Sequence, residues 1–147
     1  MFIPHVVSTE ADKVFANVLN NQAVAVSDGD ILVWNTSTPD GVRTTQPAAA
    51  TLSCFVGVAD GSIAASAYGL GQAYGYKSAA LITNDTSVAI AAGDLLIPTA
   101  AQDYLSRQAS GGDVAIGGLN GLVVAAAAVA TATTPAAATS GVFVRAL

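Results

Sequence analysis

Two carboxylates stand close enough in the sequence to do chemistry together. Asp28 and Asp30 are two positions apart in the segment VAVSDGDILVW, so on a β-strand they would share one face. Two carboxyl groups held about 5–9 Å apart can cleave a glycosidic bond. Gly29 stands between them, however, and favours a turn in which carboxylates cap backbone N–H groups. The capping role is therefore the preferred interpretation of this pair.

Other side chains suited to catalysis are scarce. His5 is the only histidine, Cys54 the only cysteine and Glu10 the only glutamate. A hydrolase would have to combine Asp28 or Asp30 with His5. His5 stands in a segment that is expected to be extended, and such a segment is a poor place for a pre-organised base. One histidine and one cysteine do not make a transition-metal site or a disulfide within the chain. We expect no enzymatic activity, no metal and no cofactor.

A Gly-Asp phrase occurs twice. VAVSDGDILVW begins at Val24 and VAIAAGDLLIP begins at Val88, and in both a β-branched run meets Gly-Asp before an aliphatic triplet. The four turn residues are Gly29, Asp30, Gly93 and Asp94. The glycines can supply the unusual backbone angle, and the aspartates can accept hydrogen bonds from turn N–H groups. The phrase therefore predicts one hairpin used twice rather than a catalytic Asp30/Asp94 pair.

Three aromatic residues are candidates for an interface. Tyr74 and Tyr76 lie two positions apart in AYGLGQAYGYK and would point to one face of a strand. Together with Trp34 they could form a platform on which a sugar ring stacks. Packing in the core or between subunits would use the same residues, and both interpretations stay open.

The chain carries few charges. Charged residues make up 10% of the sequence, against about 25% in a typical domain, and the net charge is -5. The cations are dispersed singly along the chain, so nucleic acid is not an expected partner. So weakly charged a surface is easier to explain if other subunits cover part of it. The most apolar window, residues 114–130, is interrupted by GGLNG and is short for a membrane helix, so no membrane association is expected.

Residues 1–22 differ from the rest and are expected to form an N-terminal arm. The opening segment MFIPHVVSTEADK lacks the pattern of a signal peptide, and Pro4 favours an extended chain. The segment STEADKVFANVLNN predicts a short helix capped by Ser8 or Thr9, with a strand through Lys13–Leu19 as the alternative.

From Ala23 onward the chain is typical of an all-β domain. Short β-branched runs alternate with turn clusters, which predicts a compact β-sandwich or β-barrel of about 8–11 short strands over residues 23–147. The expected strands are 23–27, 30–35, 42–45, 52–59, 70–77, 79–83, 87–91, 94–98, 113–117, 121–131 and 141–146.

Several motifs in order resemble those of small tailed-bacteriophage head proteins of the decoration, or capsid cement, type. They are GDILVW, PDGVRTTQPA, FVGVADGSIAASAYGLGQAYGY, VAIAAGDLLI and GVFVRAL, and the resemblance covers residues 23–147. It implies a β-rich virion structural protein on the capsid exterior, without enzymatic activity or cofactor. The implied partners are the major capsid protein and further copies of the chain, in a homotrimer ahead of a dimer.

The resemblance also implies that the arm adds to a capsid strand or reaches a neighbouring subunit. Its candidate docking residues are Phe2, Ile3, Val6 and Val7. Deleting residues 1–22 is then expected to abolish docking and leave the fold intact. A carbohydrate-binding or adhesive surface module is the alternative, and a small hydrolase using His5 with Asp28 and Asp30 is a third hypothesis.

Overall fold

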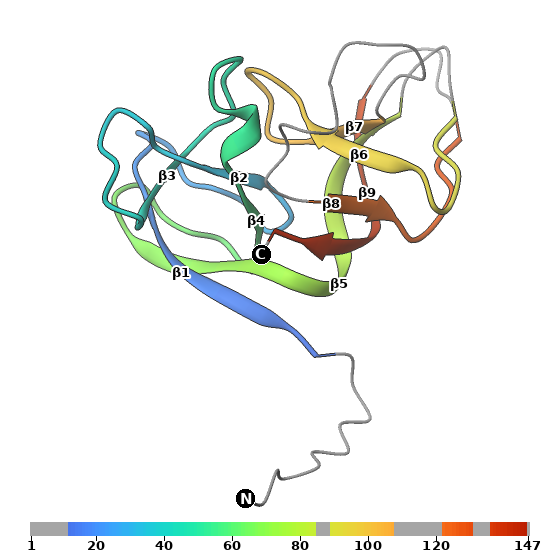
Figure 1. The fold of residues 1–147 in the computed structure, drawn as a ribbon, viewed down its shortest axis with the longest axis horizontal. Helices are drawn as coiled ribbons and strands as arrows, with labels where there is room; N and C mark the ends of the chain where they lie inside the picture. The colour runs from blue at the N-terminus through green and yellow to red at the C-terminus, as the bar shows by residue number, and fades with distance from the viewer. Residues whose placement is uncertain (1–11, 85–88, 108–121, 131–135, 147) are drawn as a thin grey trace, which may run out of the picture.

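The strands of the protein close into two rings that share one long strand (Figure 1). The computed structural model describes residues 12–84, 89–107, 122–130 and 136–146. The order of hydrogen-bonded strands is β1-β3-β2-β4-β5-β7-β6-β8-β9, and the added pairings β1–β5 and β5–β9 close the rings. The strands in the described residues are β1 (Val14–Asn20), β2 (Ile31–Trp34), β3 (Arg43–Thr45), β4 (Phe55–Ala59), β5 (Tyr68–Asn84), β6 (Leu95–Pro98), β7 (Leu105–Arg107), β8 (Leu122–Ala125) and β9 (Ala136–Arg145), and a 3-10 helix η1 (Leu52–Cys54) precedes β4.

We call the ring of β1, β3, β2, β4 and the first part of β5 ring 1. Ring 2 consists of the second part of β5 with β7, β6, β8 and β9. Strand β5 pairs with β1 over residues 68–74 and with β9 over residues 74–84. It runs along the lower edge of Figure 1 and then bends upward, which carries the chain from ring 1 directly into ring 2.

The two rings repeat one set of strand pairings. Equivalent antiparallel pairs flank the two Gly-Asp turns: Val26↔Ile63 and Ile31↔Val58 in ring 1, and Ile90↔Val129 and Leu95↔Val124 in ring 2. The segments before and after each turn pair with one neighbouring segment and not with each other, so the hairpin expected from the sequence is wrong in both copies, although the turn itself is present. The parallel contacts repeat as well, because β1 pairs with β3 as β5 pairs with β7. The chain therefore contains an internal structural repeat, and the doubled phrase is its part visible in the sequence.

Each ring has an apolar interior. The cluster in ring 1 consists of buried residues Val18, Val26, Leu32, Val56, Ala59 and Ile63. The cluster in ring 2 also takes in Ile31, Phe55 and Val58 from β2 and β4 of ring 1. Because side chains alternate along a strand, β2 points Leu32 into ring 1 and Ile31 toward ring 2. The outer face of the β2–β4 pair is therefore the surface on which ring 2 packs.

Two glycines on β5 permit this close packing. A Cβ atom at Gly69 would stand 2.5 Å from Cγ1 of Ile63, and one at Gly71 would stand 2.8 Å from Cδ1 of Leu32. Both distances are shorter than carbon atoms tolerate, so β5 can lie against the interior of ring 1 only without side chains there. The glycine-rich stretch GLGQAYG is thus a packing feature of the shared strand.

The all-β, compact fold predicted from the sequence is confirmed. Strands lie close to the expected 30–35, 42–45, 94–98 and 141–146, whereas 23–27 and 87–91 contain isolated bridges at Val26 and Ile90. Strands expected at 70–77 and 79–83 are one continuous strand, β5, and β7 was not expected. The strand expected at 113–117 lies outside the described residues.

The short helix expected after Thr9 is wrong over the residues described, because Val14–Asn20 form strand β1, which was the alternative. Ladder pairing with β5 and burial of Val18 outweigh a weak helical pattern in a segment rich in β-branched residues. Strand β1 belongs to ring 1, so the arm expected over residues 1–22 is too long at its end. Phe2, Ile3, Val6 and Val7 lie outside the described residues.

Candidate functional site

The two Gly-Asp turns make the same local hydrogen bonds. Oδ2 of Asp30 accepts from the N–H of Ser27 at 2.6 Å, and Oδ2 of Asp94 accepts from the N–H of Ala91 at 2.8 Å. Gly29 has a φ of 90° and Gly93 a φ of 93°, in the region that glycine adopts without steric cost. In both turns the aspartate caps the backbone.

The surroundings of the two turns differ. The carbonyl oxygen of Gly29 accepts from the N–H of Leu81 on β5 at 2.9 Å, and a Cβ atom at Gly29 would lie 2.6 Å from the carbonyl oxygen of Ala79. At Gly93 an added Cβ would meet nothing within 4 Å. The first turn is therefore wedged into the junction of the two rings, and the second is exposed.

A buried lysine ties the first turn to the shared strand. Lys77 on β5 is 6% exposed, and its Nζ donates to Oδ1 of Asp28 and Oδ1 of Asp60, both at 2.7 Å. Oδ1 of Asp28 also accepts from the N–H of Gly61 at 2.9 Å. Asp28 is thus engaged at the junction and does not form a carboxylate pair with Asp30.

The charges in this cluster stabilise one another. The hydrogen bond from Lys77, followed by that from Gly61, lowers the pKa of Asp28. Burial alone would lower the pKa of Lys77, but hydrogen bonds and charges from Asp28 and Asp60 outweigh it and raise that pKa. A nucleophilic lysine needs a lowered pKa. Lys77 is therefore a cation that joins the rings and lacks the lowered pKa of a nucleophile.

Asp30 and Asp94 differ in charge environment. Burial raises the pKa of Asp30. The hydrogen bond from the Ser27 N–H lowers this pKa by less, and the neighbouring carboxylates of Asp103 and Asp28 raise it further. Asp94 instead pairs with Arg107 of β7, whose Nε lies 2.8 Å from its Oδ2. Both aspartates thus cap their turns, but only the carboxylate of Asp94 has an arginine partner in the described residues.

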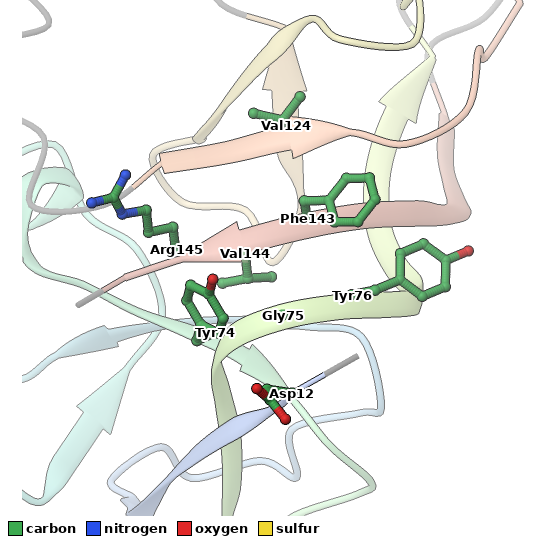
Figure 2. Close-up of a pocket in the computed structure, with 8 residues that line it drawn as sticks. All are labelled: Asp12, Tyr74, Gly75, Tyr76, Val124, Phe143, Val144 and Arg145. Carbon is green, nitrogen blue, oxygen red and sulfur yellow. The ribbon is translucent and has the colours of Figure 1, made fainter. Parts of the chain in front are cut away.

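An apolar groove of about 420 Å³ lies where β1, β5, β8 and β9 meet (Figure 2). It is lined by Asp12, Tyr74, Gly75, Tyr76, Val124, Phe143, Val144 and Arg145. The rings of Tyr76 and Phe143 lie side by side, with centroids 5.4 Å apart and planes tilted by 53°. Phe143 is 54% exposed, Tyr74 43% and Tyr76 38%, so the groove presents aromatic surface to solvent.

Strand register explains how these rings meet. Tyr76 pairs directly with Phe143, and Tyr74 with Arg145, across the β5–β9 ladder. Directly paired residues of antiparallel strands project to the same face. At the entry of β1, Asp12 crosses close over Gly75, where a Cβ atom would collide with the carbonyl oxygen of Asp12. Gly75 therefore lets the segment before β1 lie at the groove.

The groove suits binding better than acid–base chemistry. Its size falls within the range of about 300–1,000 Å³ that is usual for ligand clefts. Aromatic rings and Val124 form its surface, and the charged side chains of Asp12 and Arg145 stand at separate places on its border (Figure 2). Such a surface can receive apolar side chains of a partner or the face of a sugar ring.

The expected platform of Trp34, Tyr74 and Tyr76 comes together only in part. Tyr74 and Tyr76 share the groove, whereas Trp34 is half-buried and packs against the interior cluster of ring 1. Phe143 takes the place of the missing ring. Its strand was expected from the sequence, but nothing in the residue pattern reveals that β9 pairs with β5.

Within the described ranges, no group of three or more histidine, cysteine, aspartate or glutamate residues is placed to hold a metal ion. Cys54 is a free, half-buried cysteine, and His5 lies outside the described residues. No helix in the part of the chain that the structure describes is long and apolar enough to cross a membrane.

Comparisons with known proteins returned no match, whether against protein-family models, curated proteins or solved structures.

Proposed function

We propose that this chain is a virion structural protein of the decoration, or cement, type, which binds the outer surface of a capsid and stabilises the head. The observation that carries the proposal is the position of the apolar groove. It lies at Asp12, where the segment containing Phe2, Ile3, Val6 and Val7 joins ring 1. The groove, together with the apolar segment that precedes Asp12 in the sequence, would give each copy a docking region on a rigid body.

The use of charged groups supports a role without catalysis. Asp28, Asp60 and Lys77 join the rings, and Asp94 pairs with Arg107. These ionisable groups are therefore engaged in structural contacts and are not held in a cleft with a neighbour suited to proton transfer. A cement protein requires this combination of a closed scaffold and low reactivity.

Repetition on a shell would make modest contacts sufficient. A symmetric capsid offers many equivalent binding sites side by side. When a copy is held through its arm, the effective concentration of its groove at the neighbouring capsid surface rises, so two linked contacts bind more tightly than either alone. An extended arm can add main-chain hydrogen bonds to a capsid strand, while its side chains supply specificity.

The test is co-sedimentation of the protein with undecorated tailed-phage shells. We expect the full-length chain to sediment with shells and a chain lacking residues 1–11 to lose at least about tenfold in affinity, as loss of one of two linked contacts predicts. A full-length variant with Phe2, Ile3, Val6 and Val7 replaced by serine is the matched control for arm length. Full affinity of the truncated chain would refute the role of the arm, and failure of the full-length chain to bind any shell would refute the cement function.

Carbohydrate binding is the second candidate, favoured by the exposed rings of Tyr74, Tyr76 and Phe143 in one groove. A glycan array should then give a signal that Tyr76→Ala abolishes. Tyr68→Ala is the control, because Tyr68 is 65% exposed on the same strand but outside the groove. An array without signal would dispose of this candidate and leave the cement proposal untouched.

A further inference from the structure

The two rings carry an equivalent row of side chains on their outer faces. Directly paired residues form each row: Ile31, Val58, Gln72 and Phe15 in ring 1, and Leu95, Val124, Phe143 and Tyr76 in ring 2. Since cross-strand partners project to one side of a sheet, each row is a continuous strip of surface. We call the second strip the ring 2 face.

The strip of ring 1 is covered over most of its length. Ile31 is 1% exposed and Val58 and Gln72 are 0% exposed, and Ile31 and Val58 belong to the apolar cluster of ring 2. Phe15, at the end of the strip, is 40% exposed. At the equivalent positions of ring 2, Leu95 and Val124 are half-buried and Phe143 is 54% exposed. The ring 2 face therefore has the apolar character of a surface that is buried elsewhere in the same molecule.

The Gly-Asp turns show the same asymmetry. The turn at Gly29 sits against Ala79 and Leu81 on the second part of β5, at the margin of the contact between the rings. The equivalent turn at Gly93 has open space around its glycine. Ring 2 thus repeats both surfaces with which ring 1 contacts it, and both are free of such a contact in the described residues.

Ring 1 has an exposed position at the margin of the surface that would complete this contact. Strand pairing identifies the equivalent residues of the two rings. In ring 1, Trp34 at the end of the first phrase pairs with Thr44, which pairs with Asn20. In ring 2, Pro98 at the end of the second phrase pairs with Leu105, which pairs with Ile82, so Asn20 and Ile82 are equivalent. This register places Asn17 of β1 where Ala79 stands on β5. Asn17 is exposed. On the edge away from β5, β1 has a strand partner in the described residues only at Leu19 and Asn20.

We propose that the ring 2 face binds ring 1 of a second copy of this chain, so that the contact between rings within one chain is repeated between chains. A second copy is the occupant because ring 1 is the structural equivalent of ring 2. The new contact would also repeat, between two chains, the packing of one ring on the next that already exists between ring 1 and ring 2 within one chain. The ring 2 face includes Tyr76, Val124 and Phe143 of the groove, so the proposal concerns free protein in solution, where no capsid occupies the groove. It does not rest on the capsid role.

The symmetry of such a contact follows from its two different surfaces. The ring 2 face of one copy meets the β1 side of the next, so the contact is heterologous and generates a closed ring of subunits or an open series. A single contact of this kind does not give a two-fold dimer, because it leaves the ring 2 face of one copy and the β1 side of the other free. This difference makes the proposal testable without knowing the number of subunits.

Sedimentation velocity of the full-length protein over a range of concentrations tests for association through this face. We expect species larger than a dimer, and a Phe143→Ser variant that associates at least about tenfold more weakly, as for an aromatic residue central to an interface. Phe143→Thr is the second variant, because threonine has a higher strand propensity than serine. Thermal unfolding checks that both variants are folded. Val24→Ser is the control, because Val24 is 64% exposed and belongs to neither surface. A monomer at every concentration, or association that the two Phe143 variants leave unchanged, would overturn the proposal.

Crosslinking tests the geometry. In a Cys54→Ser background, one chain carries Ala92→Cys in the second turn and another carries Asn17→Cys on β1. A short bis-maleimide should join the two variants when they are mixed and should join neither variant to itself. Crosslinks between two Ala92→Cys chains would show a two-fold contact and overturn the head-to-tail arrangement.

Discussion

Lys77 and Asp28 are joined across the junction of the two rings, with 2.7 Å between Nζ and Oδ1. Asp60 accepts a second bond from the same ammonium at 2.7 Å. The side chain of Lys77 is 8% exposed, whereas that of Asp28 is 52% exposed. A buried cation therefore reaches outward to two carboxylates that keep part of their hydration, which lessens the cost of desolvating the pair.

Replacing the lysine should destabilise the protein measurably. Lys77→Met keeps most of the apolar stem and removes the charge, so Asp28 and Asp60 lose their partner, and we expect a loss of about 1–3 kcal/mol in unfolding free energy. Arg43→Met is the control, since it breaks the exposed Arg43–Asp40 pair, and a solvent-exposed pair contributes little to stability. Urea unfolding measures both, and equal losses would contradict a special role of the junction.

The contribution of this cluster should depend on pH at both extremes. The pKa of Asp28 is lowered from 3.8 on folding, so its stabilisation is complete above that value and is lost as pH falls through the folded pKa. The pKa of Lys77 is raised from 10.5, so its stabilisation is complete below that value and is lost as pH rises through the folded pKa. The difference in unfolding free energy between wild type and Lys77→Met should be flat at intermediate pH and shrink at both ends. A difference that does not change with pH would show that packing alone is measured.

The equivalent glycines should respond differently to alanine. Both have positive φ, so both substitutions should cost about 1 kcal/mol in backbone strain. Gly29→Ala must in addition displace the backbone of β5 at Ala79, whereas Gly93→Ala meets open space. We therefore expect the loss at Gly29 to exceed the loss at Gly93 clearly in urea unfolding. Equal losses would mean that the contact between the first turn and β5 adjusts without cost.

The equivalent aspartates offer a second matched comparison. An asparagine at either position retains an oxygen that can accept the turn N–H bond. The pKa of Asp30 is raised from 3.8 by burial, so its contribution to stability is greatest at low pH and is reduced as pH rises through the folded pKa. Asp30→Asn removes this penalty and should cost nothing at pH 7. Asp94→Asn breaks the pair with Arg107 and should lose about 0.2–1 kcal/mol, and a reversed order in thermal unfolding would refute this assignment.

Two truncations should separate the arm from the body. Removing residues 1–11 leaves β1 complete, and we expect an unchanged far-ultraviolet circular dichroism spectrum. Removing residues 1–20 deletes β1, exposes the ladder of β5 over residues 68–74 and takes buried Val18 from ring 1. We expect the longer truncation to unfold ring 1, in contrast to the expectation drawn from the sequence for residues 1–22. A stable chain without β1 would show that ring 1 does not need to close.

Local chemistry was within reach of the sequence. Most strand segments followed from β-branched runs between turn residues, and the turns at Gly29 and Gly93 followed from glycine and aspartate, whose preferences act over three or four residues. The hairpins expected at these turns were wrong, because the segments on both sides of each turn pair with one neighbouring segment. The sharing of a strand face by Tyr74 and Tyr76 also followed, since it depends only on the two-residue period of a strand. The short helix expected over residues 8–21 was wrong in its described part, because helix propensity is weak against ladder pairing with a distant strand.

The tertiary structure alone decided which surfaces meet. Lys77, Asp28 and Asp60 gave no motif, because their contacts join segments whose separation in the sequence carries no period. Phe143 lies in the groove because β9 pairs with β5, whereas Trp34 lies on β2 and packs against the interior cluster of ring 1. The doubled phrase predicted two alike turns but not their unlike surroundings, since burial of one face and exposure of its equivalent depend on how closed rings pack. Periodicity specifies the direction of a side chain on its own strand, whereas strand order specifies what that side chain contacts.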